Sequence, residues 1–372
     1  MSSHISELEI METLRYYFSS YCCECGASRE LIIKINGNRF KIIRLLAEND
    51  LTFVYLLKAI DEVPYRNRNF FALKKITCPF GDIESVSEAL QEIDMYKMFQ
   101  NRYITSCMDS QIKQEGNGSK IVNILLPYYS YGSLQEIINK NLLDGTYISE
   151  KECIRLMIGI CKGLQYLHDP KNRPYDDVES NFNSSTIIDT NDETDALLLN
   201  NPIEASTIDI QDNHKISYSH KNLKPSNILI NDDHEPVIGD LSACSKAVTT
   251  FTKVPDIEVH KEWVSSHCQL EFAAPELLQP KIGMTVDSKV DIWSLGCTLY
   301  NLMFGISPFE REEQLNGTPK RAAIQKGLFT YPQQKRYSQT LLETISKCID
   351  INPSTRYSTK ELLAQLDTLQ NT

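Results

Sequence analysis

The spacing of apolar residues predicts a strand-rich first part of the chain. Apolar and polar residues alternate over residues 31–45, and Asn36-Gly37-Asn38 within this stretch is a hairpin signal, because Asn and Gly accept the left-handed backbone of a tight turn. Residues 53–60, 70–76 and 122–126 have the length and apolar content of further strands. Residues 83–99 instead carry apolar side chains at helical spacing. We therefore expect a twisted antiparallel sheet with one helix packed on it.

The second part of the chain is predicted to be mainly helical. Ser149 and Glu152 have the spacing of a capping box, in which each side chain bonds a backbone N–H at the helix start. That helix should run to about residue 168. An apolar helix is expected to begin at Asp291, and residues 341–369 should form two or more terminal helices. The pattern as a whole predicts an α+β fold.

A strongly acidic segment, residues 170–217, interrupts the second part. It holds 10 acidic and 3 basic residues and is rich in Asn, Ser and Thr, a composition typical of disordered chains. Its run Leu197-Leu198-Leu199 is either a short docking helix or a small local hydrophobic cluster. We expect a tail over residues 1–30, a first lobe over 31–127, and a second lobe over 128–372 that contains this disordered insert.

Size and composition exclude several classes of protein. A chain of 372 residues that is 41% hydrophobic can bury the cores of two structural units. A net charge of −11 argues against a nucleic-acid partner, which requires a basic surface. No apolar run is long enough to span a bilayer, and the polar start of the chain does not resemble a signal peptide. The 11 cysteines are mostly scattered singly, which favours a reduced intracellular protein.

The most informative motif is His220-Lys221-Asn222-Leu223-Lys224-Pro225-Ser226-Asn227. It resembles the catalytic loop H-R-D-L-K-P-x-N of protein kinases, with Asn222 where that family has its catalytic aspartate. Phe71-Ala72-Leu73-Lys74, Gly239-Asp240-Leu241-Ser242 and Ala274-Pro275-Glu276 follow the order of other kinase motifs. The resemblance to eukaryotic protein kinases covers roughly residues 38–369. It implies a bilobal fold with an antiparallel sheet and one helix in the N-lobe and a mainly helical C-lobe.

Details of these motifs narrow the resemblance. Three features resemble the Numb-associated kinase family. They are the pair Asp240-Leu241 in the metal-binding motif, the hinge Leu125-Leu126-Pro127-Tyr128-Tyr129, and the cysteines near the N-terminus. Within it, the chain resembles the lipid-modified branch, which includes fungal serine/threonine kinases of the vacuolar membrane.

The resemblance implies a role for each matching residue. Lys74 would contact the α- and β-phosphates of ATP, held by Glu92, with Glu88 one helical turn earlier as the alternative; the neighbouring Lys75 is expected to be exposed. Asp240 and Asn227 would bind Mg²⁺.

The other implied roles concern the transferred phosphate, the hinge and the scaffold. Lys224 would neutralise the transferring phosphoryl group. Leu126 and Tyr128 would line the nucleotide site from the hinge. Two structural contacts are also implied, a Glu276–Arg356 pair and an anchor for the catalytic loop from Asp291.

Four departures from the family pattern concern catalysis. The amide of Asn222 can orient a substrate hydroxyl but cannot accept its proton, and losing a general base costs ~10²–10⁴-fold in rate. Ala47, Asn49, Thr52 and Val54 are the candidate nucleotide-binding residues of the phosphate loop. The first three replace its glycines, and only Asn imitates glycine's backbone freedom well, so nucleotide should bind weakly.

The other two departures concern the activation segment, which Ala274-Pro275-Glu276 closes. Ser242 replaces a glycine after the metal motif, and we expect it to restrict the movement that places Asp240. Lys221 replaces the arginine that meets a phosphorylated activation loop, and it lacks the bidentate guanidinium fork. Candidate phosphorylation sites in that loop are Thr249, Thr250 and Thr252.

Cys22, Cys23 and Cys25 form a cluster near the N-terminus. They are candidate S-palmitoylation sites, because two or more acyl chains anchor a protein stably to a membrane. Half of a zinc site and three incidental thiols are the alternatives. N-myristoylation is excluded because the second residue is Ser2 rather than glycine.

The leading functional hypothesis is a membrane-associated member of the serine/threonine kinase family, on the cytoplasmic face of an endomembrane such as the vacuole. It would bind Mg-ATP weakly, transfer phosphate poorly or not at all, and act through contacts with a regulatory protein partner. The main alternative is an active ATP-dependent kinase of protein substrates that tolerates Asn222. A nucleotide-free membrane adaptor is the third.

Overall fold

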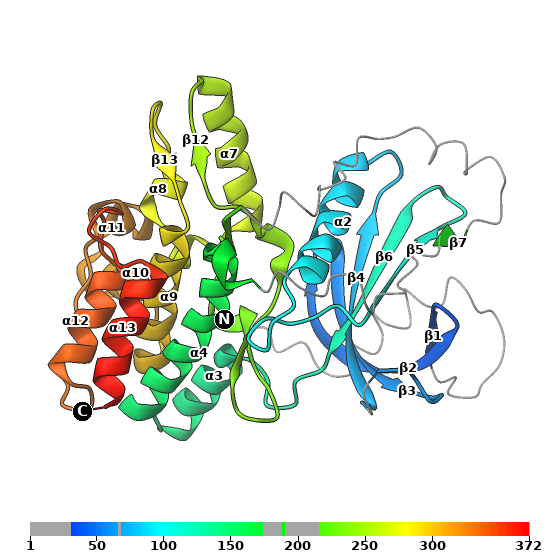
Figure 1. The fold of residues 1–372 in the computed structure, drawn as a ribbon, viewed down its shortest axis with the longest axis horizontal. Coiled ribbons are helices and arrows are strands. Elements are labelled where there is room, and N and C mark those ends of the chain that lie inside the picture. The colour runs from blue at the N-terminus through cyan, green and yellow to red at the C-terminus, as the bar shows by residue number, and fades with distance from the viewer. Residues whose placement is uncertain (1–30, 66–67, 174–187, 190–215, 372) are drawn as a thin grey trace.

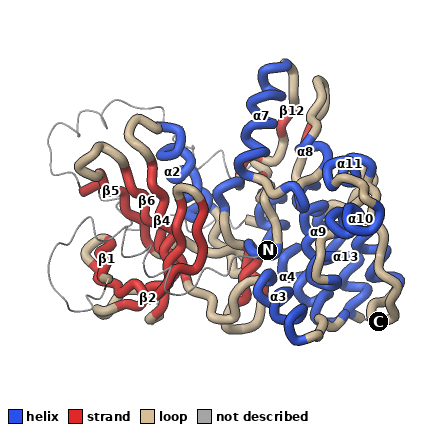
Figure 2. The backbone as a smooth tube through the Cα atoms, turned by 180° about the vertical axis from the view of Figure 1, so that it is seen from behind, coloured by secondary structure: helices blue, strands red, loops and turns tan. Residues whose placement is uncertain are grey.

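The computed structural model describes residues 31–65, 68–173, 188–189 and 216–371, and it has two lobes. Strands and one helix, α2 (Ile83–Met98), form the N-lobe, and the remaining long helices form the C-lobe (Figure 1). Figure 2 shows the same division from behind, with strands gathered on one side and helices on the other. The predicted α+β bilobal class is confirmed.

The N-lobe is built on one curved sheet with the strand order β1-β2-β3-β4-β6-β5-β7. All neighbouring strands are antiparallel except β5 and β7, which are parallel. The strands are β1 (Ile32–Ile35), β2 (Asn38–Asn49), β3 (Thr52–Ala59), β4 (Phe70–Cys78), β5 (Asp109–Gln114), β6 (Lys120–Pro127) and β7 (Ile188–Asp189).

The predicted β1–β2 hairpin is confirmed, and its turn also contacts a distant strand. Asn36 and Gly37 have φ angles of 43° and 87°, the pair of left-handed residues that a type I′ turn requires. The Asn36 side chain donates from Nδ2 to Asp109 Oδ1 in β5 at 2.7 Å. The turn after the first strand therefore lies close to β5, although β1 and β5 are five positions apart in the strand order.

Each face of the sheet has its own apolar cluster. One face continues into the main core of the protein through α2 and the C-lobe. The other face holds a separate N-lobe cluster of buried side chains, namely Ile35, Phe40, Tyr55, Leu57, Phe71, Leu73 and Leu125. Lys75 on β4 was expected to be exposed. It is half-buried, because it lines a small cavity together with apolar residues of β1, β2 and β3. That expectation was wrong.

The C-lobe is organised around α9 (Lys289–Phe304), in which residues 290–303 are all buried. No helix of the described ranges is both long and apolar enough to cross a membrane. The other helices of the C-lobe are α3 (Leu134–Asp144), α4 (Glu150–His168), α7 (Val254–His267), α8 (Pro275–Leu278), α10 (Pro308–Asn316), α11 (Lys320–Lys326), α12 (Gln339–Cys348) and α13 (Thr359–Gln370). The C-lobe also contains short two-stranded sheets. They pair β8 (Tyr218–Ser219) with β11 (Ser245–Lys246), β9 (Ile228–Ile230) with β10 (Pro236–Ile238), and β12 (Thr249–Thr250) with β13 (Thr285–Val286).

The start of α4 agrees only in part with the predicted capping box. The Ser149 hydroxyl accepts the N–H of Glu152 at 3.2 Å, so this N-cap is confirmed. Glu152 does not bond back to the cap; its carboxylate forms a two-pronged ion pair with Arg155. A guanidinium one turn along the helix is a better donor for this carboxylate than a single backbone N–H.

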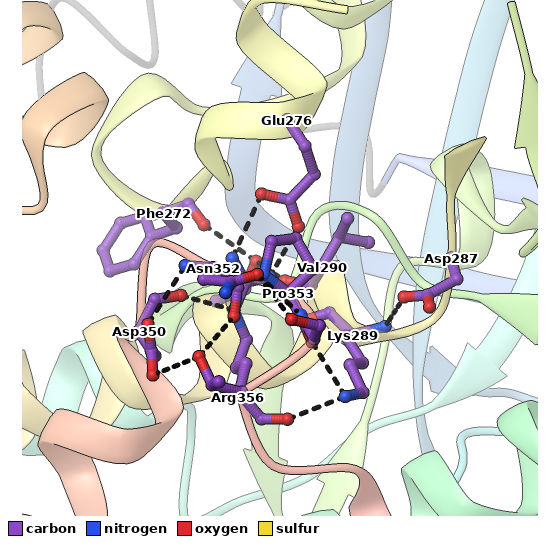
Figure 3. A network of polar contacts seen from close by, with 12 residues as sticks. Phe272, Glu276, Asp287, Lys289, Val290, Asp350, Asn352, Pro353 and Arg356 are labelled. Atoms are coloured by element: carbon purple, nitrogen blue, oxygen red, sulfur yellow. Dashed lines mark hydrogen bonds and ion pairs between the residues drawn. The ribbon is translucent and has the colours of Figure 1, made fainter. Parts of the chain in front are cut away.

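A buried ion pair holds the end of the activation segment to the C-lobe (Figure 3). Arg356 donates to the Glu276 carboxylate at 2.5 and 3.1 Å, and both side chains are excluded from solvent. Lys289 adds two bonds from its ammonium to the carbonyls of Pro353 and Arg356, each at 2.8 Å. The predicted Glu276–Arg356 contact is therefore present.

Several sequence predictions fall on residues outside the described ranges. These include the tail over 1–30 with Cys22, Cys23 and Cys25, and all but a few residues of the acidic insert. Of the insert, Ile188 and Asp189 form the two-residue strand β7 beside β5.

Candidate active site

Lys74 projects from β4 toward α2. The sheet register pairs it with Val54 on β3 and Ile124 on β6, so it lies in the middle of the sheet. Its ammonium donates to both carboxylate oxygens of Glu92, at 2.7 and 2.8 Å. Glu88, the alternative partner, instead lies 3.2 Å from the ring of His267. The structure therefore selects Glu92 as the partner of Lys74.

The Lys74 ammonium also lies 2.9 Å from Asp240 Oδ1, so it bridges two carboxylates. Burial lowers the pKa of Lys74, but the charges of Asp240 and Glu92 raise it more, and the net pKa lies well above the usual lysine value. Burial raises the pKa of Asp240, yet the ammonium and two hydrogen bonds hold it far below the usual range. Lys74 and Asp240 are therefore both charged, whereas burial raises the pKa of the Glu92 carboxyl above its usual value.

Asp240 and Asn227 lie together, as the metal interpretation requires. Asn227 Nδ2 is 3.4 Å from Asp240 Oδ2 and donates to the backbone carbonyl of Asn222 at 2.9 Å. Mg²⁺ prefers oxygen ligands and is usually held by one or two protein groups plus phosphates. A carboxylate and an amide beside Lys74 fit Mg²⁺ with a nucleotide.

Asp291 supports the catalytic loop from the start of α9. Its carboxylate accepts the backbone N–H groups of His220 and Lys221 at 2.7 and 2.8 Å, and the ring of His168 lies 2.8 Å away. Lys221 has a φ of 62°, a left-handed conformation that costs a non-glycine residue about 1–2 kcal/mol. The two hydrogen bonds to Asp291 stabilise this conformation, so the predicted anchor is present.

Asn222 occupies the base position at the mouth of the loop. Its Oδ1 is 3.4 Å from the backbone N–H of Gln269, in the segment that follows α7. Lys224, two residues later, is half-buried, and its carbonyl accepts the N–H of Asn227 at 3.0 Å. The loop thus keeps an ordered geometry around an amide that has no basic function.

The segment at the phosphate-loop position is a tight β-hairpin. Ala47 pairs with Val54, and Asn49 pairs with Thr52, across the turn between β2 and β3. Asn49 does not adopt the left-handed φ of the glycine that it replaces, and its side chain instead accepts the N–H of Asp50 at 2.9 Å. Strand pairing therefore continues to the tip of the hairpin.

The hinge begins in the last residues of β6 and continues beyond it. Leu126 pairs with Ala72 of β4, Pro127 ends β6, and Tyr128 is the first residue beyond it. Leu126 and Tyr128 are both half-buried. The two hinge residues predicted to line the nucleotide site thus lie at and just beyond the end of β6, an interior strand of the sheet.

Three contacts in and near the activation segment were not foreseen from the sequence. The Ser242 hydroxyl donates to Asp240 Oδ1 at 2.9 Å. The Lys221 ammonium donates to the carbonyl of Lys246 at 3.1 Å and lies 5.5 Å from the centre of the Trp263 ring on α7. Lys221 is buried by these contacts.

Sequence reasoning also missed Tyr96 and His168. Tyr96 contacts Glu92, and its position four residues later on the same helix face was the signal that could have identified it. His168 ends α4 and contacts Asp291; no pattern in the sequence points to this pair.

Comparison with known proteins agrees with this geometry. The protein kinase domain family model matches residues 210–366. The serine/threonine-protein kinase ENV7 of Saccharomyces cerevisiae is 44% identical over 358 residues, which cover 95% of this chain and 97% of that protein. The serine/threonine-protein kinase ppk13 of Schizosaccharomyces pombe is 33% identical, with 90% and 92% covered. Serine/threonine-protein kinase 16 of Rattus norvegicus is 27% identical, with 93% and 95% covered.

The relatives span nearly the whole of the chain, and the matched family model includes the catalytic loop, the metal motif and the buried Glu276–Arg356 pair. The chain belongs to the serine/threonine protein kinase family.

Proposed function

We propose that this protein binds Mg-ATP and has strongly reduced or absent phosphoryl transfer, so that it acts mainly as a regulator or scaffold through its kinase fold. The observation that carries this proposal is the ordered catalytic loop with Asn222 at the base position. A neutral amide at this point can orient a hydroxyl group but cannot take its proton.

The remaining machinery supports nucleotide binding. Lys74 is charged and held by Glu92, in the position where it would contact phosphate oxygens. Asp240 and Asn227 would hold Mg²⁺, which when bound neutralises charge on the phosphates. Because two carboxylates surround Lys74, nucleotide without the divalent cation would be repelled from the site.

The hairpin at the phosphate-loop position supports weak binding. Side chains at Ala47, Asn49 and Thr52 prevent the close backbone approach to phosphate that glycines permit. Asp50 at the tip adds a negative charge near the place where phosphates would lie. Affinity for Mg-ATP should therefore be lower than in kinases with the full glycine loop.

A combined binding and transfer experiment tests the proposal. Mg-ATP should raise the melting temperature of the wild-type chain, whereas Asp240→Ala should show no such shift. With radiolabelled ATP and a generic protein substrate, the wild type should stay near the Lys74→Ala background. Asn222→Asp should raise transfer by about 10²-fold or more. Robust wild-type transfer that Lys74→Ala abolishes would overturn the proposal.

An active kinase is the second candidate, favoured by the assembled contacts of Lys74 with Glu92 and Asp240. It predicts measurable wild-type transfer that Asn222→Asp increases further. Equal backgrounds for wild type and Asp240→Ala would exclude it. A nucleotide-free adaptor predicts no thermal shift with Mg-ATP at any concentration.

Membrane association is proposed through S-palmitoylation of Cys22, Cys23 and Cys25, with the vacuolar membrane as the expected location. The support comes from the sequence cluster and from the resemblance to the lipid-modified kinases. Replacing all three cysteines by serine should abolish hydroxylamine-sensitive acylation and move the tagged protein from membrane to cytosol. Unchanged acylation and membrane recovery in that variant would reject this anchor.

A further inference from the structure

The end of α3 exposes two adjacent leucines to solvent. Leu142 is 61% exposed and Leu143 is 87% exposed, and Tyr147, shortly after the helix, is 56% exposed. Residues 142–147 are all exposed, and α3 lies at the lower margin of the C-lobe in Figure 1. Single apolar residues on a surface are ordinary, whereas apolar residues gathered in one place mark a contact with another molecule.

A cavity of about 230 Å³ lies beside these residues, between the end of α3, the end of α9 and the loop before α12. Ile138 and Met303 are buried and line its inner wall, whereas Leu142, Tyr147 and Arg336 are exposed and line its opening. Sites for drug-sized ligands hold about 300–1,000 Å³. This cavity is therefore suited to the end of one apolar chain rather than to a whole ligand.

The opening of the cavity is basic. The Arg336 guanidinium lies over the Tyr147 ring, 4.4 Å from the ring centre, which keeps it beside the exposed leucines. Lys335 precedes it and is exposed, as is Lys140 on α3. Within the described residues, none of these three basic groups forms an ion pair with a carboxylate. Their charges are therefore available to an anion.

The carboxylates near the opening do not cancel this charge. Asp144 ends α3 and is the one acidic residue between Lys140 and Tyr147. Glu150, at the start of α4, is engaged by Ser338, whose N–H and hydroxyl donate to it at 2.6 and 2.5 Å. This surface therefore keeps an excess of positive charge, although the chain as a whole carries −11.

We propose that the end of α3 and the loop before α12 form a contact surface for a bilayer that contains anionic lipids. At such a boundary, leucines enter the edge of the acyl region, tyrosine lies at the level of the headgroups, and basic side chains contact anionic headgroups. Leu142, Leu143, Tyr147 and Arg336 combine these three properties in one place, and the cavity would accept the end of an acyl chain. A groove for a partner helix would instead need apolar pockets along several helical turns, which this short tip does not offer.

This inference deepens the proposed membrane association and rests on it, because it adds a contact that the cysteines do not supply. One acyl chain alone gives only marginal, reversible binding, so stable anchoring needs a second signal. The surface on the C-lobe is such a signal, and it would also determine which side of the kinase fold faces the membrane.

Vesicle binding of the full chain produced in bacteria, where the cysteines stay unacylated, tests this surface alone. The wild type should cosediment with vesicles of phosphatidylcholine and phosphatidylserine, and less with vesicles of phosphatidylcholine only. Arg336→Glu should lower binding to the anionic vesicles by about 10- to 30-fold, because it exchanges an attractive charge for a repulsive one. Leu143→Asn should lower binding to both kinds of vesicle by about 5- to 10-fold, because an apolar side chain no longer enters the boundary.

Two matched controls carry the same changes elsewhere on the C-lobe. Leu315 on α10 is 59% exposed, and Arg321 on α11 is also exposed. Leu315→Asn and Arg321→Glu should bind within about 2-fold of the wild type, as expected for surface changes outside a contact. Equal losses in control and test variants would overturn the inference. No binding of the wild type to anionic vesicles would also overturn it and would leave a protein partner as the occupant of this surface.

The two membrane contacts are measured separately. Hydroxylamine-sensitive acylation reports on the three cysteines, whereas the unacylated chain reports on the surface at α3. Loss of the first with intact vesicle binding would reject the acyl anchor only, and the reverse result would reject this surface only.

Discussion

The Ser242 hydroxyl donates to the same Asp240 oxygen, Oδ1, that the Lys74 ammonium contacts. A residue that departs from the kinase pattern therefore belongs to the group that orients the metal-binding carboxylate. The hydroxyl also contributes to the low pKa of Asp240, after the larger effects of burial and of Lys74. Loss of the glycine here has replaced backbone freedom by a fixed side-chain contact.

We expect Ser242→Ala to weaken Mg-ADP binding by about 3- to 10-fold, because Asp240 would lose one of its orienting hydrogen bonds. Calorimetric titration with Mg-ADP measures this directly. Ser245→Ala is a matched control, since that hydroxyl, three residues later, bonds only the carbonyl of Ala243. Tighter binding in Ser242→Ala would mean instead that the serine restricts Asp240 unfavourably.

The support of the catalytic loop by Asp291 should depend on pH. Burial raises the pKa of this carboxyl, but the contact with His168, together with the charge and the backbone N–H of His220, outweighs burial and holds the pKa below its ordinary value of 3.8. A carboxyl with a lowered folded-state pKa stabilises the fold above its unfolded pKa and loses that contribution as pH falls through the folded value. We expect Asp291→Asn to reduce the free energy of unfolding by about 2–4 kcal/mol at pH 7.

Urea unfolding of wild type and Asp291→Asn at several pH values provides the measurement. The difference between them should stay constant from pH 7 to about pH 5 and shrink below about pH 3.8. The exposed Asp233→Asn removes the same charge and should change stability little. A difference that grows toward acid pH would contradict this account.

The activation segment should stay ordered without phosphorylation. The Lys221 ammonium, which would otherwise be available to a phosphate group, is buried against the Lys246 carbonyl and the Trp263 ring. Replacing Thr249 and Thr250 together by alanine should therefore leave hydrogen exchange of α7 unchanged; Thr252 is kept, because its hydroxyl donates to Asp256 in the first turn of α7. Trp263→Leu should accelerate it, because a contact worth about 0.5–2 kcal/mol is lost. Strong loosening of α7 in the alanine variant, or after phosphatase treatment, would show that a phosphate holds this segment.

The Glu276–Arg356 pair should contribute strongly to stability. Arg356→Ala leaves a buried carboxylate without its partner, and we expect a loss of about 3–5 kcal/mol in the free energy of unfolding. Arg39→Ala breaks an exposed ion pair with Asp61 and should have a far smaller effect, since solvent screens that pair. Similar losses in the two variants would show that burial of the Arg356 pair has no special weight.

The sequence predicted elements well where the local signal and the tertiary environment agree. The Asn36-Gly37 turn, α2 and the central α9 are confirmed because a turn pair or an apolar period determines each one. Strand β5 was missed because its Asp, Ser, Gln and Lys residues have low strand propensity; pairing with β6 outweighs that propensity. The predicted bond from the Glu152 carboxylate back to the helix start is not formed, because the Arg155 guanidinium is a stronger donor to that carboxylate.

The site was predictable as a list of residues but not as a set of contacts. Lys74, Asn227 and Asp240 follow from motif order, and the structure brings them together. The contacts of Tyr96 and Ser242 depend on how α2 and the metal segment approach each other, and no local pattern encodes that approach.

The contact between Asn36 and Asp109 has a consequence for the solubility of the N-lobe. The margin of a β-sheet presents free N–H and C=O groups, which can recruit strands from other molecules and begin aggregation. Here the turn of the first strand bonds both the Asp109 side chain and the Ser110 carbonyl of β5, and Lys113 reaches back to the carbonyl of Lys34. These bonds occupy the carbonyls of Ser110 and Lys34, so these two groups are not available to a strand of another molecule.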